Sequence, residues 1–236
     1  MYGYGYYGFD WTYLLLIIGM LLSLAASAKL KSTFARYKRV RSASGLTGEE
    51  AARRILYSAG ITDVQVRPVA GHGTAGVSMP VWLPSSQSWR RITGQTSLAA
   101  VGVAAHECGH AIQHATNYAP LEMRSAIVPA ANIGSSLSWP LFLIGLFAGI
   151  RPLVTAGIVL FSLAVLFQLV TLPVEINASS RALKMLQSTG ILGTDETRGA
   201  RKVLTAAAMT YVAALAASIL QLLRLLILAG GRRRDD

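Results

Sequence analysis

Long apolar runs dominate the pattern of hydrophobic and polar positions along the chain. Three of them have about the 17–25 residues that a membrane-spanning helix needs: residues 11–28, 126–149 and 152–173. Only a short turn around Arg151 separates the last two, so a transmembrane hairpin is predicted over residues 126–173. A fourth run, 206–228, contains Gln221 and Arg224, and we predict an apolar helix there that is either spanning or re-entrant.

The run at residues 11–28 is predicted to be a retained transmembrane anchor. A signal peptide is the alternative, because Ala26-Ser27-Ala28 resembles a cleavage site. A signal peptide carries its basic residues before the apolar stretch, however, and here they follow it, beginning at Lys29. We therefore expect the amino end outside the cell and residues 29–124 in the cytoplasm.

Shorter elements are predicted in the polar segments. Residues 46–60 predict a helix with Thr47 as N-cap, Glu50 completing a capping box and Gly60 as the stop. Alternating apolar positions predict a short strand within residues 61–69.

Three later segments complete the predicted organisation. Residues 71–94 are rich in Gly, Ser and Pro and have no clear period. Residues 96–116 predict a helix. In the polar region 174–204 we predict another helix that opens at Glu175, because Pro173 is expected to end the preceding hairpin arm.

Composition supports an integral membrane protein. Hydrophobic residues make up 53% of the chain and charged residues 14%, against about 25% charged in ordinary soluble domains. These values exclude a disordered chain and argue against an ordinary soluble domain. The single cysteine, Cys108, excludes an internal disulfide. We predict a mainly α, multi-pass membrane protein with a small mixed α/β cytoplasmic portion.

The net charge of +11 is explained by membrane orientation. Residues 29–124 contain 12 Lys and Arg residues and residues 174–204 contain 5, whereas the hairpin turn contains Arg151 alone. By the positive-inside rule both polar segments lie in the cytoplasm, so no nucleic-acid partner is needed to explain the charge. Four spans would leave Arg232–Arg234 outside, against the rule.

The sequence His106-Glu107-Cys108-Gly109-His110 matches the H-E-x-x-H pattern. On a helix, residues four apart lie on one face, so both imidazoles could bind one zinc ion. Glu107 lies beside them and suits a general base. The alternative is a helix with two histidines that bind no metal. We expect Cys108 to be a packing residue and Gly109 to leave room for a neighbouring backbone.

A catalytic zinc ion needs a third protein ligand. His114 shares the helix, but it lies about 12 Å along the axis from His106, too far for ligands on a straight helix to converge. His72 lies in the Gly-rich segment and has no ligand spacing. Glu175 follows the hairpin on the same predicted side of the membrane, so we predict it as the third ligand.

The order of H-E-x-x-H helix, transmembrane hairpin and E-x-N-A-S-x-x-A resembles the membrane gluzincins. More closely, nearly the whole chain resembles the bacterial neutral zinc metallopeptidase family often called YugP-like. Its resemblance rests on long runs such as AAVGVAAHECGHAIQHATNYAPLEMRSAIVPAANIGS and LFSLAVLFQLVTLPVEINASSRALKML. It implies a zincin-like core in which His106, His110 and Glu175 bind Zn²⁺ and Glu107 is the base.

One block departs from the family pattern. Relatives typically carry an L-T-D-H-Y-D-P-like turn and a V-x-L-S-like strand before the zinc helix, and residues 71–93 contain neither pattern. The similarity resumes abruptly at Gly94, which is typical of a compensated reading-frame shift in the gene; true divergence is the alternative. A strand there would align a peptide substrate by backbone pairing.

Together these features predict a zinc metallopeptidase in the bacterial cytoplasmic membrane, with its active site on the cytoplasmic side. The expected partners are the lipid bilayer and a peptide or membrane-protein substrate. Tyr211 is a candidate donor to the oxyanion. One alternative is a non-catalytic, zinc-binding membrane scaffold, which would have no use for Glu107. Another is an intramembrane protease, which would place H-E-x-x-H in a long apolar span and supply an L-D-G motif that this chain lacks.

Overall fold

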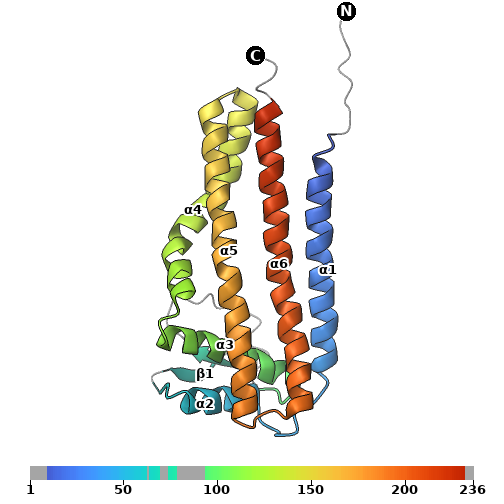
Figure 1. Cartoon of the computed structure of the whole chain (residues 1–236), viewed down its shortest axis with the longest axis vertical. Coiled ribbons are helices and arrows are strands. Elements are labelled where there is room, and N and C mark those ends of the chain that lie inside the picture. Colours follow the sequence, from blue (N-terminus) through green and yellow to red (C-terminus); the bar gives the residue numbers. More distant parts are fainter. Residues whose placement is uncertain (1–9, 63, 70–73, 79–93, 232–236) are drawn as a thin grey trace, which may run out of the picture. The chain divides into compact units, whose positions relative to one another are not determined.

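The computed structural model describes residues 10–62, 64–69, 74–78 and 94–231 (Figure 1). The chain is mainly helical, as predicted. Its elements, in order, are α1 (Tyr13–Tyr37), α2 (Gly48–Ser58), β1 (Gln65–Val69), β2 (Thr74–Ser78), α3 (Leu98–Ala115), α4 (Ala119–Ala148), α5 (Arg151–Ser188) and α6 (Thr194–Gly231). Within the described residues, α1, α4, α5 and α6 are long and apolar enough to cross a membrane. Where they enter and leave a bilayer stays a prediction.

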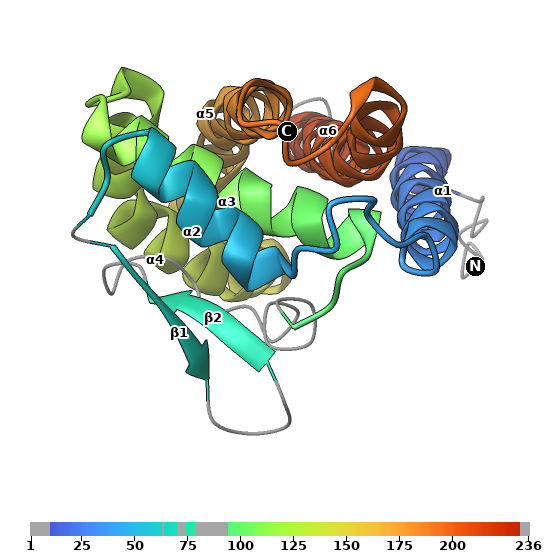
Figure 2. The same ribbon diagram turned by 90° about the horizontal axis from the view of Figure 1, so that it is seen from below.

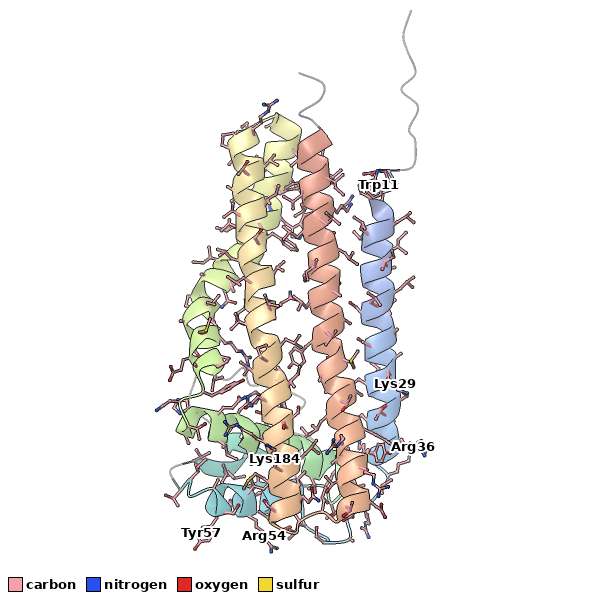
Figure 3. All side chains as sticks on the ribbon, in the orientation of Figure 1. Trp11, Lys29, Arg36, Arg54, Tyr57 and Lys184 are labelled. Carbon is pink, nitrogen blue, oxygen red and sulfur yellow. The ribbon has the colours of Figure 1, made fainter. Side chains whose placement is uncertain are left out.

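The chain divides into two compact units. Unit 1 consists of Met1–Ala25, Pro129–Leu166 and Ala213–Asp236. Unit 2 consists of Ala26–Val128 and Phe167–Val212, and it contains every predicted site residue. The labelled cations Lys29, Arg36, Arg54 and Lys184 all belong to unit 2 (Figure 3).

Unit 1 brings three chain segments to one of its ends. Phe142 and Val154, which flank the α4–α5 turn, pack with Leu225 near the end of α6. Beside Leu225, the guanidinium of Arg224 donates a hydrogen bond to the Thr12 hydroxyl (3.3 Å) and lies 4.6 Å from the centre of the Tyr13 ring. The start of α1, the hairpin turn and the end of α6 are therefore close together. Whether α6 spans the membrane or is re-entrant stays a prediction.

The expected helix end at Pro173 is wrong. Helix α5 continues without a break from Arg151 to Ser188, with Pro173 inside it. Beyond the proline, a row of fully buried residues four apart packs into unit 2, and this packing outweighs the hydrogen bond that the proline lacks. The row is Val174, Ala178, Ala182 and Leu186. The region 174–204 is thus the end of α5, a turn and the start of α6.

The core of unit 2 forms around α3, and α2 packs along α3 (Figure 2). Helix α2 begins as predicted: the Thr47 hydroxyl accepts from the Glu50 amide, and the Glu50 carboxylate accepts from the Thr47 amide. Gly60, just beyond α2, has a φ of +71°, which suits the glycine predicted to stop the helix. The apolar residues of α3 from Leu98 to Ala105 are largely buried in this core.

Strand β1 lies within the segment for which the alternation predicts a strand. It pairs antiparallel with β2, in the register Gln65↔Ser78 to Val69↔Thr74. β2 comes from the Gly-rich stretch without a clear period. The remainder of residues 71–93, including His72, lies outside the described residues, as do Arg232–Arg234.

Candidate metal centre

Side chains from α3 and α5 converge at one point in unit 2. His106 and His110 lie one turn apart on α3, and Glu175 comes from α5. Their candidate ligand atoms all lie within 4.8 Å of one another. Glu175 Oε2 is 3.3 Å from His106 Nε2 and 3.7 Å from His110 Nε2. The structure thus brings together the three residues predicted as metal ligands.

These separations suit a zinc ion. At Zn–N and Zn–O distances of about 2.0–2.1 Å, a tetrahedral site places its ligand atoms about 3.3 Å apart. The two measured separations from Glu175 Oε2 are close to that value. The imidazole rings meet edge to face, with centres 4.8 Å apart and an interplanar angle of 84°, so both Nε2 atoms can point at a common centre. The donor set of two imidazoles and one carboxylate also matches a catalytic His₂Glu site, which keeps one coordination position open.

Gly109 allows α3 and α5 to approach closely enough to form this site. A Cβ atom at residue 109 would collide with the carbonyl oxygen of Ala178 and would lie 3.0 Å from its Cα. Any larger residue would therefore push the two backbones apart. The prediction that Gly109 makes room for a neighbouring backbone is confirmed.

A buried hydrogen-bond chain fixes the orientation of His110. Arg181 Nε can only donate, and it donates to Asn177 Oδ1 (2.8 Å), so this oxygen is the acceptor. The Gln113 amide nitrogen donates to the same oxygen (3.0 Å) and to the Val174 carbonyl (2.8 Å). Gln113 Oε1 must then accept from His110 Nδ1–H (2.9 Å). The His110 tautomer that results leaves the Nε2 lone pair free for a metal ion.

The other two candidate ligands are also held by partners. His106 Nδ1 is 3.0 Å from the Ser179 hydroxyl, which can accept the Nδ1 proton and leave Nε2 for the metal. Arg124 from α4 donates to Glu175 Oε1 (3.1 Å), so only Oε2 of this carboxylate faces the histidines. The Glu175 side chain is 5% exposed, and this charged partner offsets much of the cost of burying its carboxylate.

The pKa values of Glu107, His106 and His110 on α3 all depart from their ordinary values. Burial raises the pKa of Glu107 to about 7, so its carboxylate can both take and release a proton near neutral pH. Burial lowers the pKa of His106, which favours the neutral form that binds metal. Burial also lowers the pKa of His110, but hydrogen bonding to Glu175 and the nearby charges of Glu107 and Glu175 outweigh it and hold that pKa above its ordinary value.

The other singled-out residues are not members of the ligand cluster. His114 is exposed, and the cluster of three does not include it. Cys108 is fully buried, its thiol donates to the Ala52 carbonyl (3.6 Å), and burial raises its pKa, so its predicted packing role is confirmed. Tyr211 on α6 is partly exposed and lies within electrostatic range of Glu175 and Arg124.

Sequence reasoning missed the partners that hold the ligands. Gln113 follows His110 by one helical turn, and Ser179 follows Glu175 by one turn, so helical spacing places both near the ligands. That spacing could have identified Gln113 and Ser179 as candidates. Arg124 had no such signal, because α4 reaches Glu175 only through the tertiary fold.

Comparison with known proteins assigns the chain to a family. Residues 12–230 match the family described as "Putative neutral zinc metallopeptidase". The chain belongs to this family. It is also 43% identical over 228 residues to the "Putative membrane protease YugP" of Bacillus subtilis (strain 168), covering 92% of this chain and 96% of the relative. No solved structure matches the chain significantly.

Family membership and four apolar helices together make this chain a membrane protein of a zinc metallopeptidase family. The three converging side chains, which could hold a metal ion, suit that family.

Proposed function

We propose that this protein is a membrane-embedded zinc metallopeptidase that hydrolyses peptide bonds with His106, His110 and Glu175 as zinc ligands and Glu107 as general base. One observation carries the proposal. Two imidazole Nε2 atoms and one carboxylate oxygen converge at zinc-ligand spacing. A second carboxylate, Glu107, lies within electrostatic range of His110 and Glu175 without belonging to the cluster. This arrangement supports a gluzincin-type enzyme.

When bound, a zinc ion at this site supplies a Lewis acid that acidifies water and polarises a peptide carbonyl. Glu107 takes the proton from the attacking water and passes it to the nitrogen of the leaving amine. Its pKa of about 7 suits both transfers. Arg124 keeps Glu175 Oε1 engaged, so Oε2 is the oxygen that would be left to hold a metal ion. Tyr211 is the candidate donor to the oxyanion that develops on the carbonyl oxygen.

The active site is proposed to face the cytoplasm of a bacterial cell. All but five of the 22 Lys and Arg residues belong to unit 2, which also contains the site. The exceptions are Arg151, Arg224 and Arg232–Arg234. By the positive-inside rule the polar segments of unit 2 are cytoplasmic, and the substrate is a peptide or a membrane protein with a segment on that side.

The substitution Glu107→Gln tests this function, because it removes a base and no ligand. Purified variant protein should keep one zinc ion per chain and lose at least about a thousandfold in hydrolysis of casein or membrane-derived peptides. The matched control is Glu122→Gln, which changes an exposed carboxylate on α4. Hydrolysis by Glu107→Gln at the wild-type rate would reject the assignment, and the zinc-binding scaffold would then be the better explanation.

A further inference from the structure

A groove lies between α5 and α6 in unit 2 and borders the candidate metal centre. Its volume is about 450 Å³, and it follows one face of α5 from Ile176 to Gln187 and one face of α6 from Arg201 to Val212. Ser179 lines it, and the Ser179 hydroxyl is 3.0 Å from His106 Nδ1. The groove therefore begins against the ring of a candidate zinc ligand.

The residues that line the groove change along its length from mainly apolar to cationic. The end near the metal centre is apolar and open: Ile176 and Met209 are about half exposed, and Val212 is more than a third exposed. The far end carries two exposed cations, Lys184 on α5 and Arg201 on α6. No carboxylate lines the groove in the part of the chain that the structure describes. The complementary ligand is an apolar segment with a negative group at one end.

The distance from the candidate ligands to the two cations indicates where that negative group lies on a peptide. From Glu175 to Lys184 the helix rises about 14 Å at 1.5 Å per residue. An extended peptide covers this distance in about four residues at 3.3 Å each. A carboxylate that meets Lys184 and Arg201 is then about four residues from a bond held at the zinc ligands.

The position of Lys184 along α5 argues against a bilayer phospholipid as the occupant. The apolar run of α5 ends at Pro173, and Lys184 lies 11 residues further, about 16 Å beyond the predicted hydrocarbon boundary. The headgroup layer of one leaflet is only about 5–8 Å thick. A lipid phosphate at that boundary would not reach Lys184, whereas a peptide leaving the membrane surface would.

We propose that this groove is a substrate subsite of the peptidase: it binds an extended, mainly apolar peptide whose carboxylate, about four residues from the cleaved bond, contacts Lys184 and Arg201. The carboxylate comes from an acidic side chain or from a free C-terminus. This inference rests on the proposed function. Lys184 and Arg201 then determine specificity, and they do not take part in the chemistry.

Cleavage of matched peptides by the purified, zinc-loaded full-length protein tests the subsite. The quenched fluorescent peptides differ only in having Glu, Gln or Lys about four residues from a central apolar cleavage region, on either side of it. A further pair ends at that position with a free or an amidated carboxyl group. The Glu peptide should have a kcat/KM about fivefold above that of the Gln peptide, mainly through KM, as expected for two exposed charge contacts. The preference should weaken in high salt.

Substitutions at the two cations should change this preference in a defined direction. K184Q/R201Q should remove the advantage of the Glu peptide, and K184E/R201E should favour the Lys peptide. K202Q is the matched control, because Lys202 is an exposed neighbour that does not line the groove; it should keep the wild-type ratio. Thermal denaturation checks that each variant is folded. An unchanged Glu/Gln ratio in K184Q/R201Q would overturn the subsite.

Binding measurements separate failure of the subsite from failure of the proposed function. If no peptide is cleaved, the proposed function fails, but anisotropy of dye-labelled Glu and Gln peptides still reports the groove. Tighter binding of the Glu peptide to wild type, lost in K184Q/R201Q, supports the subsite. Equal binding of the Glu and Gln peptides to wild type refutes the subsite. The subsite is also refuted if K184Q/R201Q changes binding to phosphatidylglycerol vesicles but not to the peptides.

Discussion

Replacing Gln113 by methionine should weaken zinc binding although residue 113 never touches the metal. The Gln113 side chain is fully buried and makes three hydrogen bonds, to His110 Nδ1, the Val174 carbonyl and Asn177 Oδ1. Methionine has nearly the same length but offers no acceptor of comparable strength. His110 Nδ1–H would then lose the acceptor that Gln113 Oε1 provides, so the ring could rotate or switch tautomer.

The expected magnitude follows from which groups lose a partner. Asn177 Oδ1 keeps its hydrogen bond from Arg181. The main loss is therefore the hydrogen bond of the buried His110 Nδ1–H donor. One unsatisfied buried donor costs about 1–3 kcal/mol in stability. Loss of the hydrogen-bond partner of a metal-binding histidine lowers metal affinity about 10–100-fold. Two separate readouts should therefore change together in Gln113→Met: the unfolding temperature and the zinc dissociation constant.

The variant Gln113→Glu separates these two effects. A carboxylate still accepts from His110 Nδ1–H, so the tautomer is kept, but it places an oxygen against the Val174 carbonyl and Asn177 Oδ1. We expect an unfolding temperature at least as low as that of Gln113→Met, with a zinc affinity within about tenfold of wild type. Competition with a chromophoric chelator measures the affinity. If both variants unfold earlier yet bind zinc as wild type does, Gln113 only stabilises the fold and the positioning argument is refuted.

Three further predictions address the ligand set, the helix crossing and the orientation. Glu175→Ala should abolish stoichiometric zinc, because it removes a ligand, whereas His114→Ala should retain it; metal analysis with the reverse pattern would contradict the ligand assignment. Gly109→Ala should lower the free energy of unfolding by about 1–3 kcal/mol and reduce bound zinc, because the added methyl group meets the Ala178 backbone. Gly102→Ala is the control and should be tolerated, because its Cβ would lie 3.4 Å from the Cβ of Ala200. Reporters fused after Arg41 or Lys184 should register as cytoplasmic and one at Arg151 as external, and labelling of a cysteine at residue 41 from outside the cell would reverse the orientation.

Local features of the sequence determined much of the fold. The apolar runs anticipate the four long helices, because a spanning helix must satisfy its own backbone and show apolar side chains to lipid. The capping box of Thr47 and Glu50 gives the start of α2, since both hydrogen bonds lie within four residues. The spacing of His106 and His110 likewise fixes two neighbouring imidazoles, because residues one helical turn apart share a face.

Only the tertiary structure decided how the third candidate ligand reaches those imidazoles. Glu175 lies 69 positions after His106, and no local rule relates the two. Pro173 reads as a helix end, yet buried packing of the following residues carries α5 through it. The close approach at Gly109 then brings Glu175 to the histidines, and the same crossing brings Ser179 to His106 and Val174 to Gln113. Periodicity specifies each helix separately, but the contacts between helices depend on side-chain packing across the whole unit, which no single segment encodes.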